Sequence, residues 1–313
     1  MAKATKSKAA KAKSKAAKAR SKAAKPKAAT PKTIPTLPTV RVVTPTDQST
    51  PSIQAFEAEL ASKGWKTTGP GQNIDYKVYS ASDTNSNLQG WAQQAFQDAQ
   101  AAINNNLRAV LVACGSMAAA LLQDKTTTIP IIQTLGGEVP HNRQSNMTGF
   151  TKDAEQVARH HLDKLLKAGK TVTVLFDDTN DPSRYIYNNL SPIYPNPPNN
   201  VTWLAISDPS KFSPPPALTD GFMVISNATY YNNIRAIVRM VDGKQVGGKP
   251  IEIYYPEQEF KDAHIVPTGV HVHGHKVKRA FINAADLVNK ILTSVTPFSN
   301  LPDFEEAEKE TDS

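Results

Sequence analysis

The sequence has little cysteine and no long apolar run. Its 313 residues include one cysteine, Cys114. A lone cysteine excludes an intrachain disulfide and any zinc or iron–sulfur site built from several cysteines, so a metal would need histidine and carboxylate ligands. No run of about 18 apolar residues exists, and the mean hydropathy is −0.42. These absences argue against a membrane-spanning helix.

Acidic residues are missing from the first part of the chain. Residues 1–33 hold eleven lysines and Arg20 with no acidic residue, a formal charge of +12. Of the 36 basic residues, 24 remain for residues 34–313 against all 28 acidic ones, so this longer part carries about −4. The basic character therefore belongs to a tail. The acidic residues 303–312 are expected to form a short solvated end.

The basic tail repeats every seven residues, over 6–12, 13–19 and 20–26. No position of the repeat is a large apolar residue, so a coiled-coil seam and an apolar face for a bilayer are both excluded. We expect a disordered tail that could become helical on a polyanion as far as Pro26 and Pro31, followed by an extended linker to residue 38. The composition resembles the lysine- and alanine-rich tails of linker histones and bacterial histone-like proteins.

Two functions of the tail have equal support from the sequence. In the first, the basic side chains bind nucleic acid or another polyanion without reading its sequence, and the affinity falls steeply with salt. The candidate residues are Lys6, Lys8, Lys11, Lys13, Lys15, Lys18, Arg20, Lys22 and Lys25. In the second, the tail is a solubilising spacer with no dedicated partner. An anionic membrane surface is a third and weaker alternative.

The N-terminal residues also indicate the cellular compartment. A secretory signal needs an uninterrupted apolar segment of roughly 7–15 residues, and lysines interrupt every alanine run of the tail. The expectation is a cytoplasmic protein, or a periplasmic one if translation starts elsewhere and an export signal precedes residue 39.

From residue 39 onward, short β-branched runs alternate with helical stretches, which predicts an α/β fold with parallel sheets. The predicted strands are residues 40–44, 74–79, 109–113, 128–132, 171–176, 201–206, 221–226 and 251–255. The predicted helices are 52–63, 91–103, one opening at 115–117, 153–166, 185–190 and 234–241. Because the alternation restarts after Gly149, we expect two Rossmann-like lobes.

Six segments together resemble one known family. They are residues 110–120 (VLVACGSMAAA), 127–132 (TTIPII), 146–150 (NMTGF), 220–226 (DGFMVIS), 250–260 (PIEIYYPEQEF) and 284–292 (AADLVNKIL). In this order and spacing, over roughly residues 39–302, they are similar to the ABC-transporter substrate-binding proteins related to tryptophan-binding lipoproteins, which have the type I periplasmic-binding-protein fold.

The resemblance implies two lobes, residues 39–148 with 264–295 and residues 149–263, followed by a C-terminal segment 296–313. It implies that a solute such as an amino acid is held between the lobes, without catalysis and without a cofactor, at the carboxyl ends of the strands. An ABC permease would be a partner only of an exported protein. The residues expected to bind the ligand are Thr46, Asp47, Gln48, Gly115, Ser116, Met117, Asp178, Asn180, Ser183, Asn227 and His273.

The chain departs from the family at two places near the expected ligand. Residues 136–138 (GGE) stand where the family carries an Asp-Pro pair, and residues 272–274 (VHG) stand where it carries Ser-Tyr-Gly. The identity of the ligand is therefore left open by the sequence. The competing function is a nucleic-acid-associated protein that binds through its tail, with the lobes as sensor or scaffold.

Several histidines and two side chains with nucleophilic atoms could carry other chemistry. His271, His273 and His275 alternate and could converge on a metal, but a polar rim of the cleft or a hinge strand is the favoured interpretation, and no metal site is predicted. His160 and His161 are adjacent on a helix and are expected at the surface. Ser116 lacks the G-x-S-x-G context of a nucleophile, and Cys114 is expected to be a small buried side chain. No catalytic residue is predicted.

Overall fold

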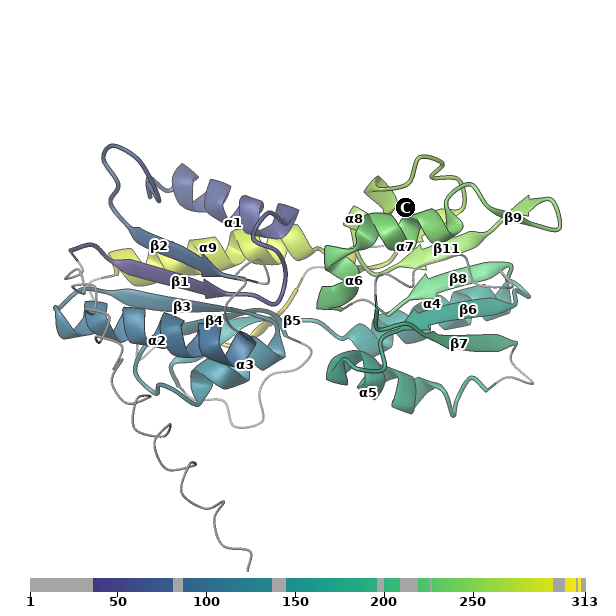
Figure 1. The fold of residues 1–313 in the computed structure, drawn as a ribbon, viewed down its shortest axis with the longest axis horizontal. Coiled ribbons are helices and arrows are strands. Elements are labelled where there is room, and N and C mark those ends of the chain that lie inside the picture. Colours follow the sequence, from purple (N-terminus) through teal and green to yellow (C-terminus); the bar gives the residue numbers. More distant parts are fainter. Residues whose placement is uncertain are drawn as a thin grey trace, which may run out of the picture. The chain divides into compact units, whose positions relative to one another are not determined.

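A computed structural model of the chain describes residues 36–80, 87–136, 145–195, 200–208, 219–225, 227–294, 302–307 and 309–310. Within these ranges, none of the helices has the length and apolar character needed to cross a membrane. The described residues form two main parallel sheets with helices on both faces (Figure 1).

The first sheet has the strand order β14-β5-β4-β3-β1-β2, with all strands parallel. Its five longer strands are β1 (Thr39–Val43), β2 (Asp75–Tyr79), β3 (Ala109–Cys114), β4 (Ile131–Gly136) and β5 (Met147–Thr151). Helices α1 (Pro51–Ser62) and α9 (Val277–Thr293) cover one face, and α2 (Leu88–Asn104) and α3 (Ser116–Gln123) cover the other (Figure 1).

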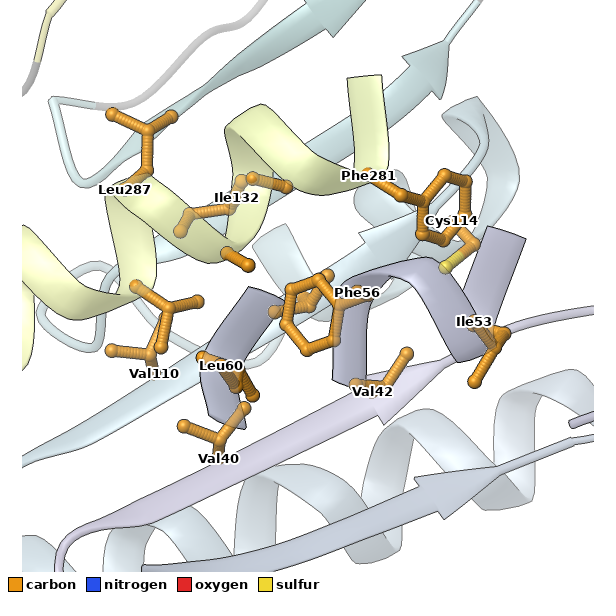
Figure 2. Close-up of a cluster of buried hydrophobic side chains, with 14 of the residues drawn as sticks. Val40, Val42, Ile53, Phe56, Leu60, Val110, Cys114, Ile132, Phe281 and Leu287 are labelled. Carbon is orange, nitrogen blue, oxygen red and sulfur yellow. The ribbon is translucent and has the colours of Figure 1, made fainter. Parts of the chain in front are cut away.

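Every residue of β1 and β3 is buried, which explains why β3 is an unbroken apolar run and why β1 is β-branched at every position except Arg41. On the α1 side, Ile53, Phe56 and Leu60 recur at helical spacing and pack against Val40 and Val42 of β1 (Figure 2). The same cluster takes in Phe281 and Leu287 of α9. A C-terminal helix thereby completes the core that the first helix begins.

The second sheet has the strand order β12-β11-β8-β6-β7 and is also parallel. Its strands are β6 (Val172–Phe176), β7 (Val201–Ala205), β8 (Gly221–Val224), β11 (Glu252–Tyr255) and β12 (Val270–Val272). Helices α4 (Ala154–Lys167) and α5 (Asp181–Leu190) pack on one face; α6 (Ala228–Asn232), α7 (Ile234–Val241) and α8 (Gln258–Asp262) pack on the other. A short hairpin, β9 (Gln245–Val246) and β10 (Lys249–Pro250), follows α7.

The predicted α/β class is confirmed, and most predicted elements lie within a few residues of their expected bounds. Three starts were misplaced by three or four residues. The helix expected from residue 91 begins at Leu88, because Asn87 caps it. The helix expected from residue 185 begins at Asp181, because Asn180 caps it and Pro182 suits its first turn. The strand expected over 128–132 begins at Ile131, directly after Pro130, which cannot donate a backbone hydrogen bond to a sheet.

Short segments connect the two sheets. The chain passes from β5 to α4 over residues 152–153 and from β12 to α9 over a stretch that holds β13 (Gly274–His275). Near the C-terminus, β14 (Glu305–Glu306) pairs with β5, and β15 (Lys309–Glu310) pairs with β13. The side chains of Glu305 and Glu306 are exposed, as expected of a solvated end, yet their backbone extends the first sheet. The exact division into lobes stays a prediction.

A buried arginine ties β1 and β2 of the first sheet to α2. Arg41, in the middle of β1 and 5% exposed, lies 2.6 Å from Asp75 Oδ2 through Nη2 and 2.9 Å from Asp98 Oδ2 through Nε. The Tyr79 hydroxyl donates a 2.6 Å hydrogen bond to the same Asp98 oxygen. Burial alone would raise the pKa of Asp98, but the bonds from Tyr79 and Arg41 outweigh it and lower this pKa.

We expect Asp98→Asn to reduce the free energy of unfolding by about 1–2 kcal/mol at pH 7, because charge-assisted hydrogen bonds are lost. The folded pKa of Asp98 lies below the unfolded value of about 3.9, so its contribution is complete above about pH 5 and is lost as the pH falls from about 4 through the folded pKa. Urea unfolding at pH 7 and pH 3 measures this. The difference in free energy of unfolding between wild type and Asp98→Asn should shrink at pH 3. As a control, substitution of the exposed Asp124 by asparagine should leave the free energy of unfolding unchanged at both pH values. An Asp98→Asn effect of equal size at pH 7 and pH 3 would contradict the account.

Candidate ligand-binding site

A cavity of about 140 Å³ lies where the carboxyl ends of strands from both sheets meet. Its walls come from the ends of β1, β3, β4 and β5 in the first sheet, from the ends of β8 and β11 in the second, and from the first turns of α1 and α9 and from α6. The lining residues are Pro45, Thr46, Ser52, Cys114, Gly115, Thr134, Lys152, Asn227, Tyr231, Glu257, Val277 and Phe281. This is the edge at which parallel α/β sheets bind ligands.

Direct hydrogen bonds join the two sides of the cavity. The hydroxyls of Ser52 on α1 and Tyr231 on α6 lie 3.0 Å apart. Next to them, Asn232 accepts a 2.9 Å bond from the Asp47 amide through Oδ1 and donates a 3.4 Å bond to the Pro45 carbonyl. These contacts span more than 170 positions of sequence, so the loop after β1 and helix α6 form one continuous wall.

Local capping explains how α6 is placed. The Asn227 side chain accepts a 3.0 Å bond from the Tyr230 amide through Oδ1, which starts the helix directly after β8. Tyr230 is fully buried, and its hydroxyl donates a 2.7 Å bond to the Ile206 carbonyl. With Tyr230 anchored in the core, the next residue, Tyr231, is held toward Ser52.

Two charged residues line the cavity, one from each sheet. Lys152 follows β5 and Glu257 follows β11, and Lys152 Nζ lies 3.5 Å from Glu257 Oε1. The Glu257 side chain is 4% exposed and that of Lys152 is 24% exposed. A nearly buried carboxylate needs compensating partners, and Lys152 supplies one from the other sheet.

The ends of β3 and β4 supply polar groups without charge. Burial raises the pKa of the Cys114 thiol to about 11, and the hydroxyls of Thr134 and Thr44 offset this only in part. At neutral pH the thiol is therefore protonated. Gly115 follows with a φ of +91°, in the region that favours glycine, and turns the chain from β3 into α3.

Three of the residues predicted to bind a ligand line this cavity: Thr46, Gly115 and Asn227. The others lie outside its lining. Asp47 bonds through its amide to Asn232, and Gln48 is exposed. Ser116 and Met117 begin α3, and Met117 is 50% exposed. A binding role for all of these residues stays a prediction.

The predicted residues of the turn after β6 have structural partners. Asn180 caps α5 by accepting a bond from the Ser183 amide, and the Ser183 hydroxyl accepts a 3.0 Å bond from the Asp177 amide. Asp178 is exposed. Asp177 itself accepts bonds from the amide and hydroxyl of Thr179, so the turn is built by its own polar side chains.

Sequence reasoning missed most of the lining, including both charged residues. Lys152 and Glu257 obey the same rule as the predicted residues, because each follows a parallel strand within two positions. The strand ending at Thr151 was not predicted as a strand, and residues 256–257 were read only as part of a family segment. Ser52, Tyr231, Val277 and Phe281 lie on helices, and their approach to the cavity depends on how the sheets meet.

The alternating histidines contact different partners. The His271 ring stacks on Tyr254 with ring centroids 4.8 Å apart, and the His273 ring stacks on His160 at 3.7 Å. His275 Nε2 lies 3.7 Å from a carboxylate oxygen of Glu306. Among the residues that the structure describes, no three His, Cys, Asp or Glu side chains are grouped as metal ligands.

The prediction that His161 lies at the surface is wrong, because its side chain is buried. Its Nε2 lies 2.7 Å from the His273 carbonyl, and its ring packs near Tyr254. The reason is that α4 turns this face toward the second sheet and the segment after β12, so its two adjacent histidines are both held against other side chains.

Several predictions fall on residues outside the described part of the chain. These are the nine candidate basic positions of the tail, the linker before residue 36, and Gly137 and Glu138 of the departure after β4.

Searches against protein-family models and against curated proteins find no match. Solved structures do match. A conserved domain protein from Vibrio cholerae has a TM-score of 0.60 at 16% identity, covering 88% of this chain and 90% of that one. The ABC domain from Streptococcus pneumoniae in complex with L-Trp has a TM-score of 0.56 at 16% identity, covering 87% and 90%.

A LacI family transcriptional regulator from Enterococcus faecalis with bound ribose has a TM-score of 0.56 at 12% identity, covering 88% of this chain and 97% of that one. These identities are low, and the similarity concerns the fold. The predicted periplasmic-binding-protein-like fold, with two α/β lobes, is confirmed. The similar structures named here include a ligand-bound ABC domain and a regulator.

We expect Cys114 to react with a thiol reagent on the order of 100-fold more slowly in the native protein at pH 8 than in urea, because burial and a pKa of about 11 leave little thiolate. The native rate should rise about tenfold per pH unit between pH 7 and pH 9. Since the chain has one cysteine, release of a chromogenic thiol reports this site alone. A native rate equal to that in urea would contradict the burial of this part of the cavity.

Proposed function

We propose that the protein binds a small polar solute, such as an amino acid, in the cavity between its two sheets. The observation that carries this proposal is the cavity's composition: hydroxyl, amide, ammonium and carboxylate groups from both sheets converge beside the apolar side chains of Val277 and Phe281. A concave site with few, fixed polar groups and an apolar wall is typical of small-molecule binding.

Binding without chemical conversion fits the state of the nucleophiles in the cavity. The Cys114 thiol has its pKa raised to about 11 and is protonated at neutral pH. The Ser52 hydroxyl is paired with the Tyr231 hydroxyl. Burial raises the pKa of Tyr231 above its ordinary value, so tyrosinate is not available as a base. Activation of a nucleophile needs an adjacent base of suitable pKa, and this pair does not supply one.

Solute exchange would require the two sides of the cavity to separate. The bonds that would break are those of Ser52 with Tyr231 and of Asn232 with Asp47 and Pro45. The connections after β5 and after β12 are short and would absorb the rotation, as hinges between domains do.

The test is a thermal-shift screen of the full chain against amino acids, small organic acids, sugars and nucleosides. A solute at a hundred times its dissociation constant should stabilise the protein by about 2.7 kcal/mol, which raises the melting temperature by roughly 5 °C. The same solute should slow modification of Cys114, which places it in the cavity rather than on the surface. A flat screen on folded protein would overturn the proposal.

The charge of the tail favours a second candidate function, which is sequence-independent binding of nucleic acid. Residues 1–33 carry +12 with no acidic residue. Binding of the full chain to a random DNA duplex should weaken by on the order of 10³-fold between 50 and 200 mM salt, because counterions are released from the phosphates. Replacing the nine candidate positions by glutamine removes nine of the twelve basic side chains of the tail and should weaken binding strongly. Binding that is unchanged by salt or by these replacements would contradict this function.

A further inference from the structure

Lys152 and Glu257 are the charged residues that line the cavity, and they carry opposite charges. The two charges of the lining therefore balance each other, while the carboxylate of Glu259 lies behind the lining and bonds to Tyr231. A solute with a single charge would pair with one of the two charged side chains of the lining and leave the other without a compensating partner. An uncompensated buried charge is costly. A solute that carries one positive and one negative group keeps the balance.

The geometry of the ion pair leaves room for such a solute. The distance of 3.5 Å between Lys152 Nζ and Glu257 Oε1 is longer than the roughly 2.7–2.9 Å of a tight charge-assisted hydrogen bond. The two residues also come from different sheets, after β5 and after β11, so a modest separation of the sheets would widen the pair. A zwitterion between them would replace one long ion pair by two short ones.

An additional donor lies in the same lining. Asn227 uses Oδ1 to cap α6, while its Nδ2 is buried and has no hydrogen-bond partner among the described residues. A buried amide donor without a partner costs free energy that a ligand oxygen could recover. Asn227 and Lys152 together would suit a carboxylate, which accepts several hydrogen bonds at once.

The volume limits the size of the solute. A cavity of about 150 Å³ holds a molecule of the size of benzene, and this one has about 140 Å³. Glycine, alanine and serine are of that size, whereas an indole side chain is far larger. Phe281 and Val277 close the apolar side, where a methyl or hydroxymethyl group would fit.

We propose, on the basis of the function proposed above, that the cavity selects a small zwitterionic α-amino acid of the size of glycine, alanine or serine. Its carboxylate inserts against Lys152 and Asn227 and its ammonium group against Glu257. Lys152 and Glu257 are thus the specificity-determining residues, and they recognise the two charges rather than the side chain of the ligand.

The first arm of the test uses the wild-type full chain in titration calorimetry. Glycine, L-alanine and L-serine should bind. N-acetylglycine lacks the ammonium group and glycinamide lacks the carboxylate, so each should bind at least about 30-fold more weakly than glycine, because loss of one partner of a buried charge pair costs 2 kcal/mol or more. L-tryptophan should also bind at least about 30-fold more weakly, since the cavity is too small for it.

The second arm uses variants with a matched control. Lys152→Met and Glu257→Gln should each weaken glycine binding by at least about 30-fold. Lys170 and Glu252 form an ion pair of similar length in the second lobe, 3.2 Å apart and with side chains 21% and 35% exposed, and neither residue lines the cavity. Lys170→Met and Glu252→Gln should bind glycine as the wild type does. Circular dichroism and the melting temperature establish that each variant is folded.

The outcomes separate this inference from the function on which it rests. Tight binding of a sugar, of glycinamide or of N-acetylglycine would overturn the zwitterion and leave solute binding intact. Unchanged glycine binding by folded Lys152→Met would overturn the assigned role of the ion pair. If no solute of any class binds the wild type, both proposals fail. If a variant does not fold, the comparison of glycine with its two blocked analogues still decides the question.

Discussion

Parallel strands all point the same way, so their carboxyl ends, and the loops that follow, lie along one edge of a sheet. Here that constraint acts twice, because the chain builds two parallel sheets and joins their carboxyl edges across one cavity. Residues separated by more than a hundred positions, such as Lys152 and Glu257, meet there. The polar groups that follow the strands, such as this ion pair, are consequences of strand direction rather than of any local motif.

The contacts between the two sides of the cavity are few and polar. Hydroxyl and amide bonds from Ser52 and Asn232, with the ion pair of Lys152, hold the walls together, while the apolar cores are confined to each sheet and its own helices. Polar contacts exchange with water at small net cost, whereas apolar cores do not.

Most of the fold could be predicted from local sequence patterns. Only part of the candidate site could be predicted in this way. Buried β-branched runs such as that of β1, and the helical spacing of Ile53, Phe56 and Leu60, are visible in the sequence because burial repeats with the period of each element. Thr46, Gly115 and Asn227 were found as strand-end residues. Lys152 was missed because the MTGFT strand, with a glycine and two threonines, lacks an unbroken apolar run.

The central claim is that a small amino acid occupies the cavity, and the rate at which Cys114 is modified tests it most directly, because this side chain lines the cavity and is the single cysteine of the chain. The rate would be measured in the native full chain with and without saturating glycine, using glycinamide as the control. The account predicts that glycine slows the reaction several-fold and that glycinamide does not. Equal rates under all three conditions would contradict it.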